Sequence, residues 1–190
     1  LAQTHGLRDI RGYDSIDPGR LMRLLEAIAD PDAPRLPYAL VQWFVPRATV
    51  QAPDRLQFPP ALDLLDVRHA VFRGPVPPHF KPAYHSPDYW SLANPRAVGR
   101  IFVPQRVETV ADESASLARI TAAQFDPLRV AYVETPVSLP AMVRGSAAIT
   151  NETPTRIVAR LAMETPGLVV LTDYWDRGWR AYLNGNDVPI

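Results

Sequence analysis

Residues 168–185, LVVLTDYWDRGWRAYLNG, decide how the C-terminal part of the chain folds. The β-branched and aromatic residues on either side of Asp176-Arg177-Gly178 predict strands over 168–175 and 178–183, because such side chains suit a pleated surface. Asn184-Gly185 predicts a type I′ hairpin, since both central residues of that turn need positive φ. A further strand is therefore expected near Val188.

The sequence before this stretch has the same character. Residues 155–164 predict another strand, and Pro166-Gly167 predicts the turn that follows it. From Met142 onward the pattern indicates an antiparallel sheet or sandwich over 141–190. Because three or four strands alone are marginally stable, we expect this part to pack on the rest of the chain or to be truncated and continue beyond Ile190.

The N-terminal part, residues 1–140, predicts helices mixed with short strands. Its strongest helical pattern covers 17–29, where Asp17 can cap the helix and Pro18 suits the first helical position. The same rules predict the other elements of this part: a helical turn over 61–65, a helix from Asp112 as its cap to about Gln124, and strands over 38–45, 67–72, 100–110 and 129–134.

Proline is concentrated between Pro31 and Pro104, where 14 of the 21 prolines stand. Proline lacks the backbone N–H that regular elements need, so this region is expected to hold short elements and stiff loops. Residues 74–95 are expected to form a Pro-rich surface loop. The predicted fold class is α+β, with a mixed α/β N-terminal part packed on an antiparallel β-sheet or sandwich C-terminal part.

Composition excludes several classes of protein. Twenty basic residues balance twenty acidic ones, which removes the broad positive field of a nucleic-acid binder, so no nucleic-acid partner is expected. The chain has no cysteine, and its glycines form neither GxGxxG nor GxxxxGK[ST], so no nucleotide cofactor is expected. The longest uncharged stretch, residues 36–46, has 11 residues, fewer than a membrane-spanning helix requires.

Catalytic and metal-binding residue patterns are also lacking. The four histidines do not have the spacing of a zinc site: His5, His69, His79 and His85. Of these, His69 is expected to be a partly buried structural imidazole. Asp173 and Asp176 could serve a hydrolase as acid and base only if held about 5 to 9.5 Å apart across a cleft. We interpret them as residues that end strands and favour a turn, and we expect no metal and no catalytic residue.

The aromatic loop, residues 174–179, is the candidate binding element. Tyr174, Trp175 and Arg177 could contact a sugar ring, because aromatic faces and guanidinium groups both suit glycans. Trp179 shares one strand face with Ala181 and Leu183, so it is expected in the core. Other residues are expected to be structural: Gly12, Tyr13, Asp14, Asp173 and Gly178.

Five motifs along the chain together resemble the C-terminal extracytoplasmic region of YfhO-like bacterial membrane proteins. They are GLRDIRGYDS at 6–15, LLDVR at 64–68, RIFV at 100–103, FDP at 125–127 and LTDYWDRGWRAY at 171–182. The last is the most specific, and the resemblance extends over nearly the whole chain. The chain departs from the family at Arg177, where proline is usual, and at Asn184, where aspartate is usual.

The resemblance implies that this region belongs to a longer, multi-pass membrane protein, whose transmembrane helices precede it. The general design of that protein is similar to polyprenyl-phosphate-sugar-dependent glycosyltransferases. The catalytic acid of such enzymes lies in a loop between early membrane helices, so no catalytic residue is assigned to this chain. The implied partners are the transmembrane portion of its own parent and a glycan or lipid-linked sugar. The implied location is the extracytoplasmic side of the bacterial membrane.

Two hypotheses of function follow. The first is a non-catalytic accessory domain of a YfhO-like membrane protein in cell-envelope glycosylation, where it helps to hold a glycan acceptor or a lipid-linked sugar. The second is a self-standing carbohydrate-binding or protein-interaction module that uses the aromatic loop. A soluble hydrolase that uses Asp173 and Asp176 is a third and weaker interpretation.

Overall fold

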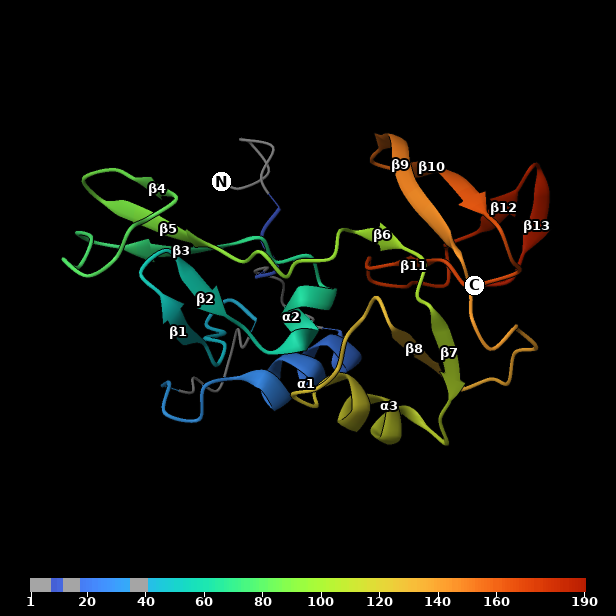
Figure 1. Cartoon of the computed structure of the whole chain (residues 1–190), viewed down its shortest axis with the longest axis horizontal. Helices are drawn as coiled ribbons and strands as arrows, with labels where there is room; N and C mark the ends of the chain where they lie inside the picture. Colours follow the sequence, from blue (N-terminus) through green and yellow to red (C-terminus); the bar gives the residue numbers. More distant parts are fainter. Residues whose placement is uncertain (1–7, 12–17, 35–40) are drawn as a thin grey trace.

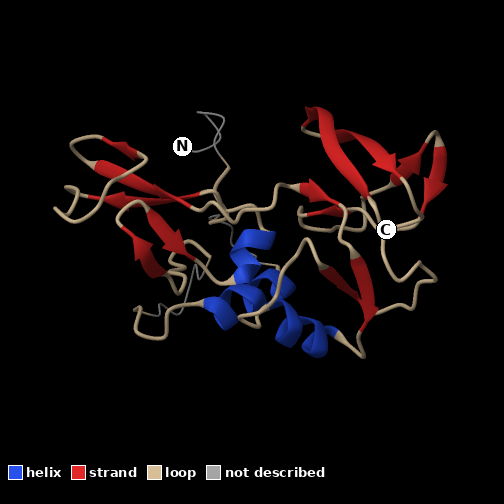
Figure 2. Cartoon of the chain, in the orientation of Figure 1, coloured by secondary structure: helices blue, strands red, loops and turns tan. Residues whose placement is uncertain are grey.

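The structure is a computed structural model that describes residues 8–11, 18–34 and 41–190. It has an α+β fold with 13% helix and 33% strand, which confirms the predicted fold class. Figure 2 shows the helices in the middle of the molecule, with one group of strands on each side. The left-hand group comes from the N-terminal half and the right-hand group from the C-terminal half (Figure 1).

The N-terminal strands form one five-stranded sheet. Its order is β1-β2-β5-β3, and β4 also pairs with β5. The strands are β1 (Thr49–Ala52), β2 (Arg55–Gln57), β3 (His69–Arg73), β4 (Tyr84–His85) and β5 (Tyr89–Ala93). Because three strands pair with β5, this strand organises the sheet.

Two helices and a turn pack on one face of this sheet and form the main core. The helices are α1 (Gly19–Ile28) and α2 (Pro60–Leu64). Their apolar residues meet those of β2 and β5 in one cluster: Leu24, Leu25, Ile28, Val41, Phe44, Leu56, Phe58, Ala61, Leu62, Trp90 and Leu92. Phe72 stacks on Trp90 with ring centroids 4.3 Å apart, which closes this core on the β3 side.

The predicted helix over 17–29 is confirmed as α1, with one correction at its start. Pro18 is the N-cap and not the first helical residue, and no side chain caps the helix. Asp17, the expected cap, lies outside the described residues. The helix ends at Ile28 because Ala29 is already extended and Pro31 cannot continue the hydrogen-bond pattern.

The predicted strand over 38–45 is wrong in its described part. Residues 41–43 form a turn, and only Pro46 makes an isolated bridge, to Ala29. Val41 and Phe44 are buried in the core cluster. A short run of β-branched and aromatic residues fits a core-filling turn as well as a strand, and here packing decides between them.

The expected Pro-rich loop over 74–95 is also corrected, because β4 and β5 lie inside it. Trp90 and Leu92 of β5 are buried on the core face, so the segment contains the central strand of the sheet. Its prolines stand before and after β5 and not within it. They therefore leave the backbone N–H groups of Tyr89–Ala93 available for pairing.

The middle of the chain holds a parallel strand pair joined by a helix. The elements are β6 (Ile101–Phe102), β7 (Arg106–Thr109), α3 (Glu113–Ile120) and β8 (Val130–Val133), and β7 pairs with β8 in parallel. The single strand predicted over 100–110 is split at Pro104 into β6 and β7. Asp112 caps α3 as predicted, since its carboxylate accepts a 2.8 Å hydrogen bond from the N–H of Ala115.

The C-terminal strands form three two-stranded antiparallel sheets. These strands are β9 (Gly145–Thr153), β10 (Arg156–Met163), β11 (Val170–Leu171), β12 (Ala181–Leu183) and β13 (Asn186–Val188). β9 pairs with β10, β11 with β6, and β12 with β13. The predicted hairpin is confirmed, because Asn184 and Gly185 have φ of 52° and 86°. The strand predicted over 168–175 is reduced to β11.

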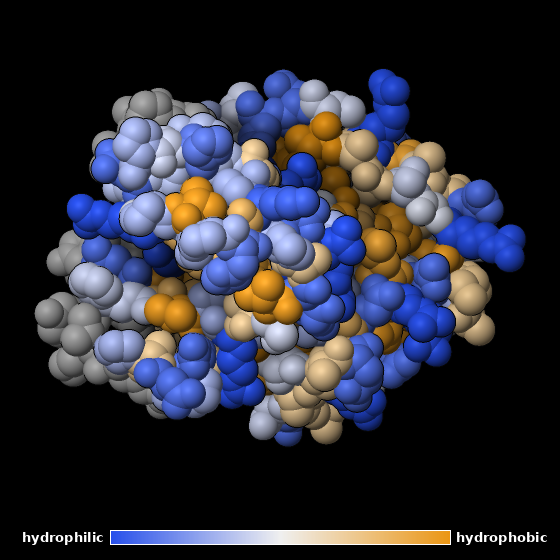
Figure 3. Space-filling model, turned by 60° about the vertical axis from the view of Figure 1, so that its left-hand side comes forward, coloured by the Kyte–Doolittle hydropathy of each residue, from blue (hydrophilic) through white to orange (hydrophobic). Residues whose placement is uncertain are grey.

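Burial is shallow after Val143. Val143 is 2% exposed, and residues 144–190, all of which the structure describes, include no buried side chain. Trp179 is half-buried and Leu183 is 48% exposed, which corrects the expectation that they share a core. The surface keeps apolar side chains among hydrophilic ones (Figure 3).

We expect Gly167→Ala to lower the free energy of unfolding by about 1 to 3 kcal/mol, as overpacking does. A Cβ at Gly167 would overlap Cγ1 of Val143 and would lie 2.9 Å from Cε of Met163. Chemical denaturation measures the loss. The control is Gly19→Ala, whose Cβ would meet nothing closer than Arg23 at 3.9 Å. Equal stability of the two variants would contradict close packing at Gly167.

Candidate functional site

The aromatic loop, residues 174–179, connects β11 to β12 and presents two rings to solvent. Tyr174 and Trp175 are each 56% exposed. The turn behind them is ordered, since the N–H of Gly178 donates to Oδ1 of Asp176 at 2.6 Å and the N–H of Trp179 donates to the carbonyl oxygen of Asp176 at 3.1 Å. The loop therefore exposes aromatic surface from a fixed turn.

An ion-pair network holds the start of this loop. Nε of Arg100 donates to Oδ1 of Asp173 at 2.5 Å, and its NH2 group pairs with Oδ2. NH1 of Arg100 also lies 2.7 Å from Oε2 of Glu152 at the tip of β9. NH2 of Arg8 donates to Glu152 at 2.6 Å. Arg100 thus joins three segments: the start of β6, the β9 tip and the residue before Tyr174.

The network keeps its charges at neutral pH. Hydrogen bonds from Arg8 and then Arg100 lower the pKa of Glu152 from 4.5 to about 2. The hydrogen bond to Asp173 is the main cause that raises the pKa of Arg100. A bidentate guanidinium–carboxylate pair is both stronger and more directional than a single contact, so Asp173 is fixed in direction as well as in position.

These shifts predict how stability depends on pH. The folded-state pKa of Glu152 lies below its ordinary value, so its stabilising effect is complete above about pH 4.5 and is lost as the pH falls toward about 2. We expect Glu152→Gln to flatten the acid limb of the unfolding free energy in that window. Glu164→Gln is the control, because Glu164 has no ion-pair partner among the residues described. An unchanged acid limb in Glu152→Gln would contradict the network.

The carboxylates of the hydrolase interpretation are both engaged. Asp173 is bound by Arg100, and Asp176 accepts from the backbone of its own turn. A general acid or base needs a proton that can move to or from the substrate. The geometry gives this pair the structural role of ending the strand and forming the turn.

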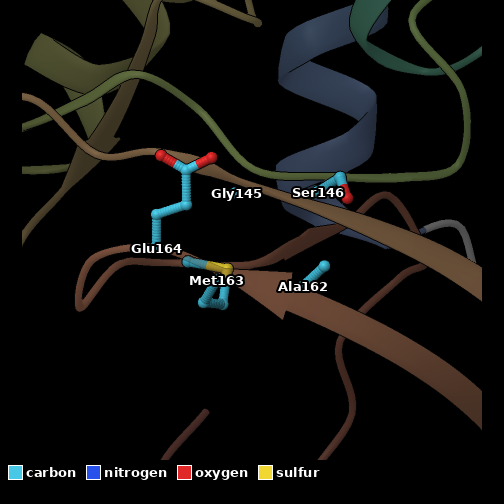
Figure 4. Close-up of a pocket in the computed structure, with 5 residues that line it drawn as sticks. All are labelled: Gly145, Ser146, Ala162, Met163 and Glu164. Carbon is cyan, nitrogen blue, oxygen red and sulfur yellow. The ribbon is translucent and has the colours of Figure 1, made fainter.

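A shallow hollow of about 380 Å³ lies between the start of β9 and the end of β10. Its lining is Gly145, Ser146, Ala162, Met163 and Glu164. Figure 4 shows that the Glu164 carboxylate and the Ser146 hydroxyl do not point toward each other. The hollow therefore offers no paired acid–base or nucleophile–base groups.

Asp63 is a buried carboxyl that sequence patterns did not indicate. It is 1% exposed and accepts a 2.9 Å hydrogen bond from Nδ2 of Asn94. Nε of Arg96 lies 2.8 Å from Oδ2, outside hydrogen-bond alignment, so Oδ2 has no hydrogen-bond donor. Burial raises the pKa of Asp63. This group ties α2 to the segment after β5.

The remaining candidates lie apart from the loop. His69, His79 and His85 are exposed, which corrects the expected burial of His69. In the described parts of the chain, no three metal-ligating side chains of His, Asp or Glu gather at one place, and no helix is long and apolar enough to cross a membrane. Three candidates at 12–14 lie outside the described residues: Gly12, Tyr13 and Asp14.

Sequence reasoning found the aromatic loop but missed the residues that hold it. Asp173 is bound by Arg100, Gly178 donates its N–H to Asp176, and Trp179 closes the turn through its backbone. Arg8, Arg100 and Glu152 were not identified. Arg100 stands in the RIFV motif, but its partners are 52 and 73 residues away, so no local pattern links them.

The fold and the site together define an α+β chain with an exposed, anchored aromatic loop. Comparison with protein-family models, with curated proteins and with solved structures found no match for this chain.

Proposed function

We propose that this chain is a non-catalytic module that holds a glycan on its aromatic loop. Its setting is the extracytoplasmic side of a bacterial membrane, as an accessory part of a YfhO-like protein of cell-envelope glycosylation. The sugar belongs to a glycan acceptor or to a lipid-linked donor. The five motifs that resemble YfhO-like proteins support this setting.

One observation carries the binding role: Tyr174 and Trp175 are neighbouring rings, each more than half exposed, on a turn fixed by hydrogen bonds. Two neighbouring exposed aromatics present flat faces that suit the apolar face of a sugar ring. A turn that is already ordered loses little entropy on binding. Arg177, exposed at the corner of the turn, adds donors for sugar hydroxyls.

We expect Trp175→Ala to weaken glycan binding at least tenfold, which corresponds to about 1.4 kcal/mol. Calorimetric titration of the whole chain with soluble dextran, mannan and galactan first identifies a ligand and then compares the variant. Trp43→Ala is the matched control, since Trp43 is an exposed tryptophan in the N-terminal half, and its affinity should equal that of wild type.

The accessory role has its own test. We expect sugar transfer by the full-length membrane protein to fall when Trp175→Ala is introduced into this region of it. The amount of that protein in the membrane should stay unchanged. Transfer at the full rate would contradict the accessory role. Equal loss of binding in Trp43→Ala and Trp175→Ala would contradict the aromatic loop as the binding element.

A further inference from the structure

The face of the N-terminal sheet turned away from the core carries a second set of side chains brought together only by strand register. Along β5, Trp90 and Leu92 point into the core, so Tyr89, Ser91 and Ala93 point the other way. We call this the outer sheet face and define it by Arg55, His69, Val71, Arg73, Tyr84 and Tyr89.

The register places these residues side by side. Arg73 of β3 lies directly opposite Tyr89, and Val71 lies opposite Ser91. Tyr84 of β4 pairs with Ser91 from the other side of β5. Directly opposed residues on one face have Cβ atoms about 5 Å apart, and diagonal neighbours are about 7 Å apart. Tyr84, Tyr89 and Arg73 therefore form one contiguous strip.

The outer sheet face is open to solvent. Val71 and Tyr84 are each 62% exposed and Tyr89 is 48% exposed. Along β3 the residues of this face are all exposed, while the two between them are half-buried. Only Ser91, a small residue between Val71 and Tyr84, is buried here. The strip thus carries two exposed tyrosines beside a small residue.

The charge on this face has one sign. The positions of β2, β3, β4 and β5 that point outward include Arg55, Arg73 and His69 and no Asp or Glu. Neither Arg55 nor Arg73 has a carboxylate within 4 Å in the described portion of the chain. In a chain of zero formal net charge, this separation of charge makes the outer sheet face complementary to an anion.

We infer that the outer sheet face binds an acidic polysaccharide, with sugar rings on Tyr84 and Tyr89 and a uronate carboxylate on Arg73. The tyrosines supply flat apolar contact with a donor at their tips, and the guanidinium fork matches a carboxylate. A single-stranded nucleic acid also stacks on aromatic platforms, but it carries a phosphate at every nucleotide and requires a stronger positive field. Arg73 supplies the fork that one uronate carboxylate needs, and a chain of zero formal net charge lacks the broad positive field of a nucleic-acid binder.

This site is separate from the aromatic loop and does not depend on the function proposed for it. The probe is an oligogalacturonate, titrated calorimetrically into the whole chain. The matched ligand is the same oligomer with every carboxylate methyl-esterified, which keeps the sugar backbone and removes the charge. We expect the acid form to bind at least tenfold more tightly than the ester.

Variants then locate the site. Tyr89→Ala and Arg73→Gln are each expected to weaken oligogalacturonate binding at least tenfold, while Trp175→Ala binds as wild type does. Arg73→Gln changes only an exposed side chain, and circular dichroism with a thermal melt confirms that each variant is folded. Tyr84→Ala, on the neighbouring strand, provides a second aromatic test if Tyr89→Ala unfolds.

Several results would overturn the inference. The inference is wrong if the wild-type chain does not bind oligogalacturonate. It is also wrong if Arg73→Gln and a folded tyrosine variant, Tyr89→Ala or Tyr84→Ala, both bind it with wild-type affinity. Loss of binding in Trp175→Ala alone would move the acidic ligand to the aromatic loop, supporting the proposed function and rejecting the outer sheet face. Tighter binding of an oligothymidylate, lost in the same face variants, would replace the polysaccharide with a nucleic acid.

Discussion

Leu92→Ala is expected to lower the free energy of unfolding by about 3 kcal/mol, the largest effect of any substitution considered. Leu92 is fully buried in β5, where it pairs with Ala70 of β3 and packs in the core with α1 and α2. Truncating a buried leucine removes transfer free energy and leaves a cavity, which together cost about 2 to 5 kcal/mol. Because β5 joins β2, β3 and β4, this site has little freedom to collapse.

Urea denaturation measures this loss, and the midpoint of thermal unfolding should fall by about 6 to 12 °C for a chain of this size. Val71→Ala is the matched control, because it shortens an exposed aliphatic side chain on the adjacent strand. We expect that control to change stability by less than about 0.5 kcal/mol. Similar losses for both variants would contradict the placement of β5 at the centre of the core.

The second large effect is expected from Arg100→Met, which removes the guanidinium and keeps most of the apolar stem. Half-buried Asp173 would then keep its charge without its partner, whereas exposed Glu152 would keep its pair with Arg8. Breaking a fully buried pair costs about 3 to 5 kcal/mol, and the partial exposure here reduces the expected loss to about 2 kcal/mol.

The same substitution should weaken the proposed glycan binding by the aromatic loop about tenfold, because Asp173 directly precedes Tyr174 and would no longer be held in direction. Arg106→Met is the control, since Arg106 is exposed and its nearest carboxylate oxygen, on Glu108, is 3.8 Å away. It should leave stability and binding unchanged. Full glycan affinity in folded Arg100→Met would show that the loop is ordered without this network.

Local signals in the sequence predicted the elements that depend on neighbouring residues. The cap at Asp112, the leucine pattern of α1 and the Asn184-Gly185 hairpin each follow from interactions within a few residues. The strand β5 was missed because the prolines around it dominate the local composition. Its role as the central strand comes from partners at 55, 69–73 and 84–85, which no local pattern reveals.

The candidate site also has one part that local sequence signals predicted and another part that they did not. The aromatic loop could be predicted because Tyr174 and Trp175 stand together beside a turn sequence. Its attachment to Arg100 could not, since that contact joins residues 73 positions apart. Asp63 gave no signal either, because burial of a carboxyl beside Asn94 is decided by how α2 meets the end of β5.

The shallow burial after Val143 has a consequence for how the molecule opens. Backbone amides exchange hydrogen with solvent through local opening where few apolar contacts resist it. The β9–β10 and β12–β13 pairs, which have no buried side chains, should therefore lose protection against deuterium well before β5. The C-terminal strands would form a separate cooperative unit, able to open and close around the anchor of the aromatic loop while the N-terminal sheet stays intact.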